Sequence, residues 1–356
     1  MNLTGAANGK KRSAVYENPM DIELLHERAR LVREVRTFFD SRQYLAVDTP
    51  LLAPDLIPES CLEVFETSWL PPGGSRQPPE KRWLIPSPEI WMKKLISRHR
   101  VNMYQICKCF RNSEPRGHHH NPEFTMLEYY TMNADYLDSL VLTEEFFAYL
   151  ADITPPGIKD ALRPPFLRIT MEEAFRRWAG FSLEAATEGV ALSARTALEK
   201  EAWRLGLDPH LDNVKDSAAV IILYDLIFIH AVEPALPKDR PLVILDYPAF
   251  VPCLSKSKGP AKQTKERWEL YLDGIELANC YTEETDPAGV RRFFEEEAAE
   301  KELHGLVKHR IDGEYWKNFQ QNGGEPPYSG VALGLDRLFM FLMDKQSIEN
   351  VLSFLF

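Results

Sequence analysis

Two apolar runs that enclose a short polar loop, between residues 104 and 130, constrain the fold most strongly. The first run, residues 104–110, is closed by Arg111, and the second follows Glu123 and contains Glu128. Runs of this length around a loop predict two antiparallel strands. An arginine offers a rigid fork to a phosphate, and fixed acids hold cations. We therefore expect a cavity here that binds an anionic, nucleotide-like ligand.

The length and the charge limit the possible classes of protein. The chain has 356 residues, enough for one large domain or two ordinary ones. Its net charge of −11 gives no overall basic surface for nucleic acid. Five scattered cysteines without framework spacing indicate a reducing compartment. Residues 1–18 lack an apolar signal segment and no run approaches the length of a membrane span, so we expect a cytoplasmic protein.

An Asp-Gly pair at residues 273–274 predicts a second hairpin, because this dipeptide between two apolar runs favours a two-residue turn. With this turn, Glu269 would face Ala278, and Glu269 and Glu276 would lie diagonally on one face, in joint reach of a cation. The alternative is a pair of solvated acids on an exposed face. Simple alternation puts Glu283 on the other face, so only a bulge or bend would let it join them.

Most of the remaining pattern is helical. Asn18-Pro19 is typical of a helix start, and apolar residues at helical spacing continue from Ile22 and Leu25 to about Arg42. Residues 171–232 look largely helical and contain no chemical signature, so we interpret them as an insert or a packing layer.

Residues 330–338 pass from a strand into a helix whose first turn contains Arg337. Glycines there would let the backbone approach a ligand closely. Taken alone, this pattern is more typical of a structural glycine and a surface arginine.

These segments together resemble a known family. The Arg111 segment with its continuation at residues 120–125, the hairpin segment 274–279 and the glycine-rich stretch ending at Arg337 resemble motifs 2 and 3 of class II aminoacyl-tRNA synthetases, in their lysine-specific branch. Residues 29–50 resemble motif 1, which forms a dimer interface in that family. The resemblance implies an α+β fold over residues 19–356, with an antiparallel sheet flanked by helices. It also implies a flexible segment at residues 1–18 and a homodimer.

The resemblance further implies which residues bind the substrates. Arg111 and Arg337 would be the catalytic cations, the first on the α-phosphate and the substrate carboxylate, the second on the γ-phosphate. The other positions matched to ATP binding are Asn112, Glu114, His120, Asn121, Phe124, Glu276, Leu277 and Gly334. The positions matched to the amino-acid substrate are Ser87, Pro88, Glu89, Glu128, Tyr130, Asn279, Tyr281, Glu283 and Ala332. Glu269 and Glu276 would bind Mg²⁺.

The match departs from the family at three positions. Ser113 adds a residue where the family has Glu after Arg-Asn, so Glu114 is assigned that role. Cys280 replaces a glycine, and Ala332 stands where lysyl-tRNA synthetases have glycine. A methyl group at 332 would fill part of the amino-acid pocket and favour a substrate whose amino group lies elsewhere. The histidines at 118–120 could suggest a metal site, although their position matches a nucleotide-binding histidine.

A lysyl-tRNA synthetase also carries an N-terminal anticodon-reading domain, and the residues before the first predicted helix are too few for one. With Ala332, this favours a resemblance to the elongation factor P–(R)-β-lysine ligase family. That resemblance implies activation of (R)-β-lysine by ATP as an aminoacyl-adenylate and transfer to a lysine side chain of elongation factor P. Two alternatives stay open: aminoacylation of tRNA or another acceptor with α-lysine, and a non-catalytic paralogue that acts as a binding subunit.

Overall fold

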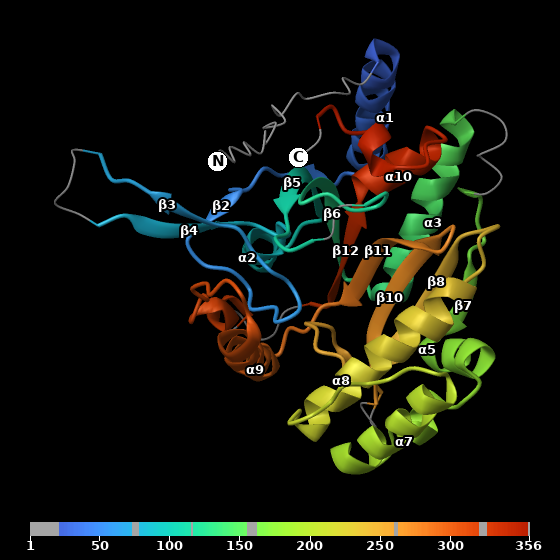
Figure 1. The fold of residues 1–356 in the computed structure, drawn as a ribbon. Coiled ribbons are helices and arrows are strands. Elements are labelled where there is room, and N and C mark those ends of the chain that lie inside the picture. The colour runs from blue at the N-terminus through green and yellow to red at the C-terminus, as the bar shows by residue number, and fades with distance from the viewer. Residues whose placement is uncertain are drawn as a thin grey trace, which may run out of the picture.

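A nine-stranded sheet forms the centre of the computed structural model, which describes residues 21–72, 78–114, 117–154, 162–259, 263–319 and 326–354 (Figure 1). The strands run in the order β1-β5-β6-β12-β11-β10-β8-β7, and β9 pairs with β10. Their bounds are β1 Leu45–Ala46, β5 Met103–Phe110, β6 Glu123–Met132, β7 Leu167–Thr170, β8 Leu242–Pro248, β9 Ser257–Lys258, β10 Thr264–Leu272, β11 Ile275–Thr282 and β12 Tyr328–Gly334. Pairing is antiparallel except between β1 and β5 and between β7 and β8. The predicted α+β fold is confirmed.

One face of this sheet carries the main hydrophobic core. Helices α1 (Ile22–Ser41), α3 (Tyr136–Ile153) and α10 (Leu335–Leu342) cover it. Their apolar side chains pack against alternate strand residues such as Tyr129 and Val331. Because strand side chains alternate between faces, the intervening residues point to the opposite side of the sheet.

Three smaller apolar clusters surround that opposite face. Helices α2 (Glu89–His99) and α9 (Pro287–His304) form the first of them. A small sheet in the order β2-β4-β3 forms the second. Its strands are β2 Leu52–Ala53, β3 Glu66–Trp69 and β4 Glu80–Leu84. The insert forms the third against β7 and β8. Polar side chains of the central strands therefore lie between walls that these clusters hold in place.

Residues 171–232 are largely helical, as predicted. The α-helices are α5 Met171–Ala174, α6 Leu183–Ala186, α7 Ala191–Arg204 and α8 Asp216–Ile227. The stretch Asp216–Ala235 is long and apolar enough, by length and composition, to span a membrane, so the prediction that no run approaches that length is wrong. Leu223 and Ile227 of this stretch are buried in the core of the insert, which accounts for its apolar composition.

The beginning of α1 differs from the prediction. Asn18-Pro19 and the segment 1–18 lie outside the described residues. The helix begins at Ile22, and Asp21 caps it by accepting a hydrogen bond of 3.2 Å from the backbone N–H of Glu23. Ile22 and Leu25 were predicted on the apolar face, but they are 62% and 37% exposed. The first turns of α1 therefore extend beyond the core that buries its later residues.

Candidate active site

Two rows of residues run across the polar face of the sheet. Each row contains one residue from each of four adjacent strands. From β6 to β10, the first row contains Glu128, Ala332, Asn279 and Glu269. In the same order, the second row contains Tyr130, Gly330, Tyr281 and Arg267. The strand register therefore brings most of the residues predicted to bind the amino acid side by side.

A bulge in the hairpin of β10 and β11 makes this arrangement possible. The register shifts between Leu270 and Tyr271, so Glu269 lies opposite Asn279. The predicted pairing of Glu269 with Ala278 is therefore wrong by one residue. The shift changes which residues of β11 point to the polar face after Glu276. This bulge is the irregularity that the sequence analysis required for Glu283 to lie on the same face as Glu269 and Glu276.

Glu128, Tyr130 and Glu283 form one end of the site. The Tyr130 hydroxyl donates a hydrogen bond of 2.7 Å to Oε1 of Glu128. The other oxygen of Glu128 is buried, and no described residue hydrogen-bonds to it. Gly330 keeps this end open, because a Cβ atom there would lie 2.4 Å from the Tyr130 ring and 2.5 Å from the Glu283 carboxylate. A buried, unpaired carboxylate oxygen beside such a glycine suits a ligand with a hydrogen-bond donor.

Lys93 of α2 is a buried cation that the sequence analysis missed. Its Nζ lies 2.5 Å from the carboxylates of both Glu89 and Glu283. Burial by itself would lower the pKa of Lys93, but Glu283 and Glu89 raise it well above its usual range. Burial raises the pKa of Glu283 to about 7, although Lys93 opposes this. Burial, reinforced by Glu89, also raises the pKa of Glu128. The acids outnumber their internal cation, so an additional ammonium group would be bound favourably.

Arg111 and Arg337 lie at the other end of the site. The guanidinium carbon of Arg111 is 5.3 Å from the centroid of the Phe124 ring. Arg337, in the first turn of α10 as predicted, donates 2.7 Å and 3.1 Å hydrogen bonds to the carbonyl oxygens of Glu276 and His119. Both guanidinium groups act electrostatically on the Glu276 carboxyl. The two arginines and the predicted metal-binding acid thus converge on one region.

Glu269 and Glu276 differ in how their carboxylates are engaged. Glu269 accepts hydrogen bonds from the hydroxyls of Tyr247 at 2.5 Å and Tyr271 at 2.6 Å, and from Arg267. Within the described ranges, the Glu276 carboxylate has neither a hydrogen bond nor an ion pair. Burial, and then the charge of Glu269, raises the pKa of Glu276 to about 7 against the opposing arginines. Two such carboxylates fit Mg²⁺, which commonly takes its other ligands from phosphates and water.

The loop after Arg111 uses two predicted ATP-binding amides to hold its own backbone. Ser113, the extra residue, has a positive φ of 58°. The Asn112 side chain accepts a 2.9 Å hydrogen bond from the Ser113 N–H and donates one of 3.2 Å to the Val64 carbonyl. Asn121 donates to the Glu123 carbonyl at 2.5 Å. In this structure these amides support the loop, and their predicted contact with ATP stays a prediction.

His120 lies near the same arginines and near Glu114. Burial lowers the pKa of His120, and Arg337 lowers it further, whereas Glu114 opposes the change. The polar loop therefore brings His120 within electrostatic reach of both Arg337 and Glu114.

Four other residues predicted to bind a substrate offer the site their backbone or hold a neighbouring residue in position. Leu277 buries its side chain in the main core, so only its backbone is available to a ligand. At Gly334, an added Cβ would lie 3.7 Å from the Leu277 carbonyl oxygen, an ordinary contact. Ser87 and Pro88 precede α2, and Pro88 occupies its N-cap position. They bring Glu89 into the first turn of the helix, from which it reaches Lys93.

The insert and the residue directly after it supply acidic side chains, although no chemical signature was found in the insert. Burial raises the pKa of Asp225 to about 6, with Arg267 acting against it and Glu269 with it. Burial and Glu269 also raise the pKa of Glu233, whereas Arg337 lowers it. Both residues are therefore within electrostatic reach of Glu269, which is predicted to bind Mg²⁺. No sequence signal could have found them, because their partners are distant in the chain and the packing of the insert brings them together.

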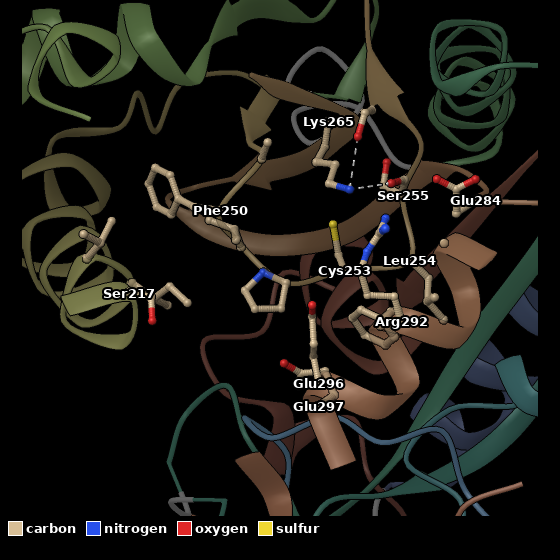
Figure 2. A pocket seen from close by; sticks show the side chains of 18 of the residues that line it. Ser217, Phe250, Cys253, Leu254, Ser255, Lys265, Glu284, Arg292, Glu296 and Glu297 are labelled. Carbon is tan, nitrogen blue, oxygen red and sulfur yellow. Dashed lines mark hydrogen bonds between the residues drawn. The ribbon is translucent and has the colours of Figure 1, made fainter. Parts of the chain in front are cut away.

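A cleft of about 900 Å³ opens beside the site (Figure 2). The insert, the segment 249–257 and helix α9 line it. Cys253 in its wall acts electrostatically on Tyr281, and Glu297 acts on Glu59, a further acid that the sequence analysis missed. Two residues that line the cleft are therefore within electrostatic reach of residues of the site.

Comparison with known proteins agrees with this geometry. The family model described as tRNA synthetases class II (D, K and N) matches residues 7–355. An elongation factor P–(R)-β-lysine ligase of Hamiltonella defensa subsp. Acyrthosiphon pisum (strain 5AT) is 32% identical over 342 residues, which cover 96% of this chain and 98% of that protein. A protein of the same description from Avibacterium paragallinarum is 31% identical over 334 residues, covering 94% and 95% respectively.

Proposed function

Because the chain belongs to the class II tRNA synthetases, and within them to the elongation factor P–(R)-β-lysine ligases, we propose that it attaches (R)-β-lysine to elongation factor P. The supporting observation is a site with two different ends. Arg111, Arg337 and Glu276 converge at one end, and Glu128 and Glu283 lie at the other. An aminoacyl-adenylate with an ammonium-bearing side chain complements both ends: its negative phosphate suits the arginines, and its positive ammonium group suits the acids.

In the first step, a carboxylate oxygen of the amino acid attacks the α-phosphorus of ATP and pyrophosphate leaves. Arg111 would hold the carboxylate and the α-phosphate, while Arg337 would hold the γ-phosphate. The ring of Phe124, next to Arg111, would stack on adenine. The chain contributes positioning and charge neutralisation, and no covalent nucleophile of its own is needed.

Glu276 and Glu269 would hold Mg²⁺. When bound, the ion would supply positive charge to the phosphate oxygens. Glu276 must be ionised for this role, so its pKa of about 7 predicts weaker metal binding in acidic solution. The three donors to Glu269 fix the orientation of its carboxylate, whereas the Glu276 carboxylate has no such donor among the described residues.

In the second step, a lysine amine of elongation factor P attacks the activated carbonyl carbon. The new amide bond forms, the bond to the phosphate oxygen breaks, AMP leaves and the amine loses a proton. A deprotonated amine is sufficiently nucleophilic that no catalytic serine or cysteine is required.

We also propose a homodimer that forms through residues 29–50. Exposed apolar side chains near this segment support the proposal, since Ile22 of α1 and Leu45 of the edge strand β1 are 62% and 54% exposed. Sedimentation measurements would test it, and a monomer at micromolar concentration would contradict it.

Two assays test the proposed activity. Pyrophosphate exchange with (R)-β-lysine and α-lysine identifies the activated amino acid, and we expect a clear preference for (R)-β-lysine. Mass spectrometry after incubation with ATP, β-lysine and either elongation factor P or tRNA identifies the acceptor. A mass increase on tRNA alone would instead support the aminoacylation alternative, and absence of adenylate formation would support the non-catalytic one.

A further inference from the structure

We propose that Glu59 forms a binding subsite for the amino group nearest the substrate carboxylate and so determines specificity for diamino acids. This inference rests on the proposed function, because it concerns the amino acid bound at that site. Glu59 lies in the segment between β2 and β3, which has no counterpart among the motifs recognised in the sequence.

The segment that carries Glu59 is fixed beside Arg111 by several contacts. The backbone N–H of Ser60 donates a 2.8 Å hydrogen bond to Glu297 of α9. Lys301 of the same helix donates to the Leu62 carbonyl oxygen. The Glu63 carbonyl accepts a 2.8 Å hydrogen bond from the N–H of residue 112, the residue directly after Arg111. The backbone directly after Glu59 is therefore fixed against α9 and against the residue that follows Arg111.

The electrostatic neighbours of Glu59 identify the region that its carboxyl faces. Burial raises the pKa of Glu59 to about 7, Glu89 adds to the increase, and Arg111 and Lys93 oppose it. These three neighbours all belong to the two ends of the site described above. Glu59 is thus within electrostatic reach of Arg111, proposed to hold the reacting carboxylate, and of Glu89 and Lys93.

The hydrogen bonds and ion pairs among the described residues leave Glu59 without a partner. Glu89 and Glu283 share Lys93, and Glu128 accepts the Tyr130 hydroxyl. Within the part of the chain that the structure describes, no hydrogen bond or ion pair reaches the Glu59 carboxylate. A carboxylate in a confined site that lacks an internal cation is stabilised by a cation from the ligand.

The buried Glu128 oxygen without a partner gives an independent sign that the site takes an ammonium ligand. Glu128 is only 2% exposed, so water cannot freely hydrate that atom. The site therefore has two unsatisfied acidic positions, Glu128 at the far end and Glu59 near Arg111. β-Lysine has two ammonium groups, one near the carboxylate and one at the end of its chain. Glu59 would pair with the first and Glu128 with the second.

A monoamino analogue separates the two positions experimentally. 6-Aminohexanoic acid has the carboxylate and the terminal amine of β-lysine but lacks the amine near the carboxylate. Glu59→Gln should raise the KM for β-lysine in pyrophosphate exchange by about 10- to 100-fold, as expected for the loss of one charged hydrogen bond. The inhibition constant of 6-aminohexanoic acid should change less than about threefold. Glu59→Asp should retain part of the affinity for β-lysine.

Glu66→Gln is the matched control, because this acid on β3 pairs with exposed Lys81 at the surface. It should leave both constants unchanged. Equal weakening of the two ligands by Glu59→Gln would overturn the proposal, as would an unchanged KM for β-lysine. Normal exchange with a loss only in transfer to elongation factor P would also overturn it and would indicate a role for Glu59 on the acceptor amine. If the enzyme activates α-lysine instead, the proposed function fails, but the comparison still tests Glu59, because α-lysine also has an amine near its carboxylate.

Discussion

Replacing Glu276 with glutamine should stabilise the folded protein at pH 8 while abolishing adenylate formation. The Glu276 carboxyl has a pKa of about 7 in the folded state, against an ordinary value of 4.5. The folded state therefore retains a proton that the unfolded chain releases, and folding stability decreases as the pH rises from about 4.5 to about 7. A shift of this size corresponds to about 3 kcal/mol. Because the side chain is only half-buried, we expect about 1–2 kcal/mol after solvent screening.

Thermal unfolding between pH 5 and pH 8 measures this difference. Glutamine has nearly the same shape and stays neutral, so variant and parent should have similar midpoints at pH 5. At pH 8 the midpoint of the variant should be higher by roughly 2–4 °C. Glu295→Gln, which alters an exposed pair with Arg291 on α9, is the control and should show little change at either pH. Lower stability at pH 8, a gain of equal size at pH 5, or normal pyrophosphate exchange would refute the reasoning.

Three further predictions concern substrate binding. Phe124→Ala should raise the KM for ATP by about 10- to 100-fold through loss of stacking, with little effect on the KM for β-lysine; equal effects on both would contradict the assignment of the adenine site. Ala332→Gly should shift the ratio of kcat/KM values towards α-lysine by about tenfold, since one methyl group changes discrimination by about 1–3 kcal/mol. Glu283, with a pKa of about 7, loses its charge as the pH falls, so the KM for β-lysine should rise between pH 8 and pH 6, and a flat profile would exclude this role.

The local elements of the hairpin could be predicted from sequence, but its register could not. Asp273 and Gly274 both adopt positive φ, as the Asp-Gly turn requires. The bulge near Tyr271 has no local sequence signal, since it depends on how β10 pairs with β8 as well as with β11. One inserted residue changes which side chains face the ligand. Alternation alone therefore placed Glu269 opposite the wrong residue, although it gave the correct pairing of Tyr271 with Glu276 next to the turn.

The acids and the cation that the sequence analysis missed all have partners that are distant in the chain. Lys93 follows Glu89 by four residues on α2, and this spacing is also common in surface ion pairs. Its burial depends on Glu283, which is 190 residues away in the chain. Glu59 and Glu233 likewise gain their chemical surroundings from distant segments. Motifs identify residues that recur in a fixed local order, whereas these groups are defined only by tertiary packing.

Lys93 also has a consequence for how the site discriminates between ligands. By pairing with Glu89 and Glu283, it neutralises part of the negative charge that would otherwise repel a triphosphate in the proposed ATP site. The remaining acids, Glu59 and Glu128, have raised pKa values, so without a ligand each holds a proton to higher pH than an ordinary carboxyl group does. An arriving diammonium substrate favours the ionised form of both acids and so releases protons from them, whereas a neutral side chain of the same length gives these acids no countercharge. Selectivity for diamino acids should therefore be accompanied by proton release, which calorimetry in buffers of different ionisation enthalpy can measure. Binding of β-lysine without net proton release between pH 6 and pH 7 would show that the ligand does not reach these acids.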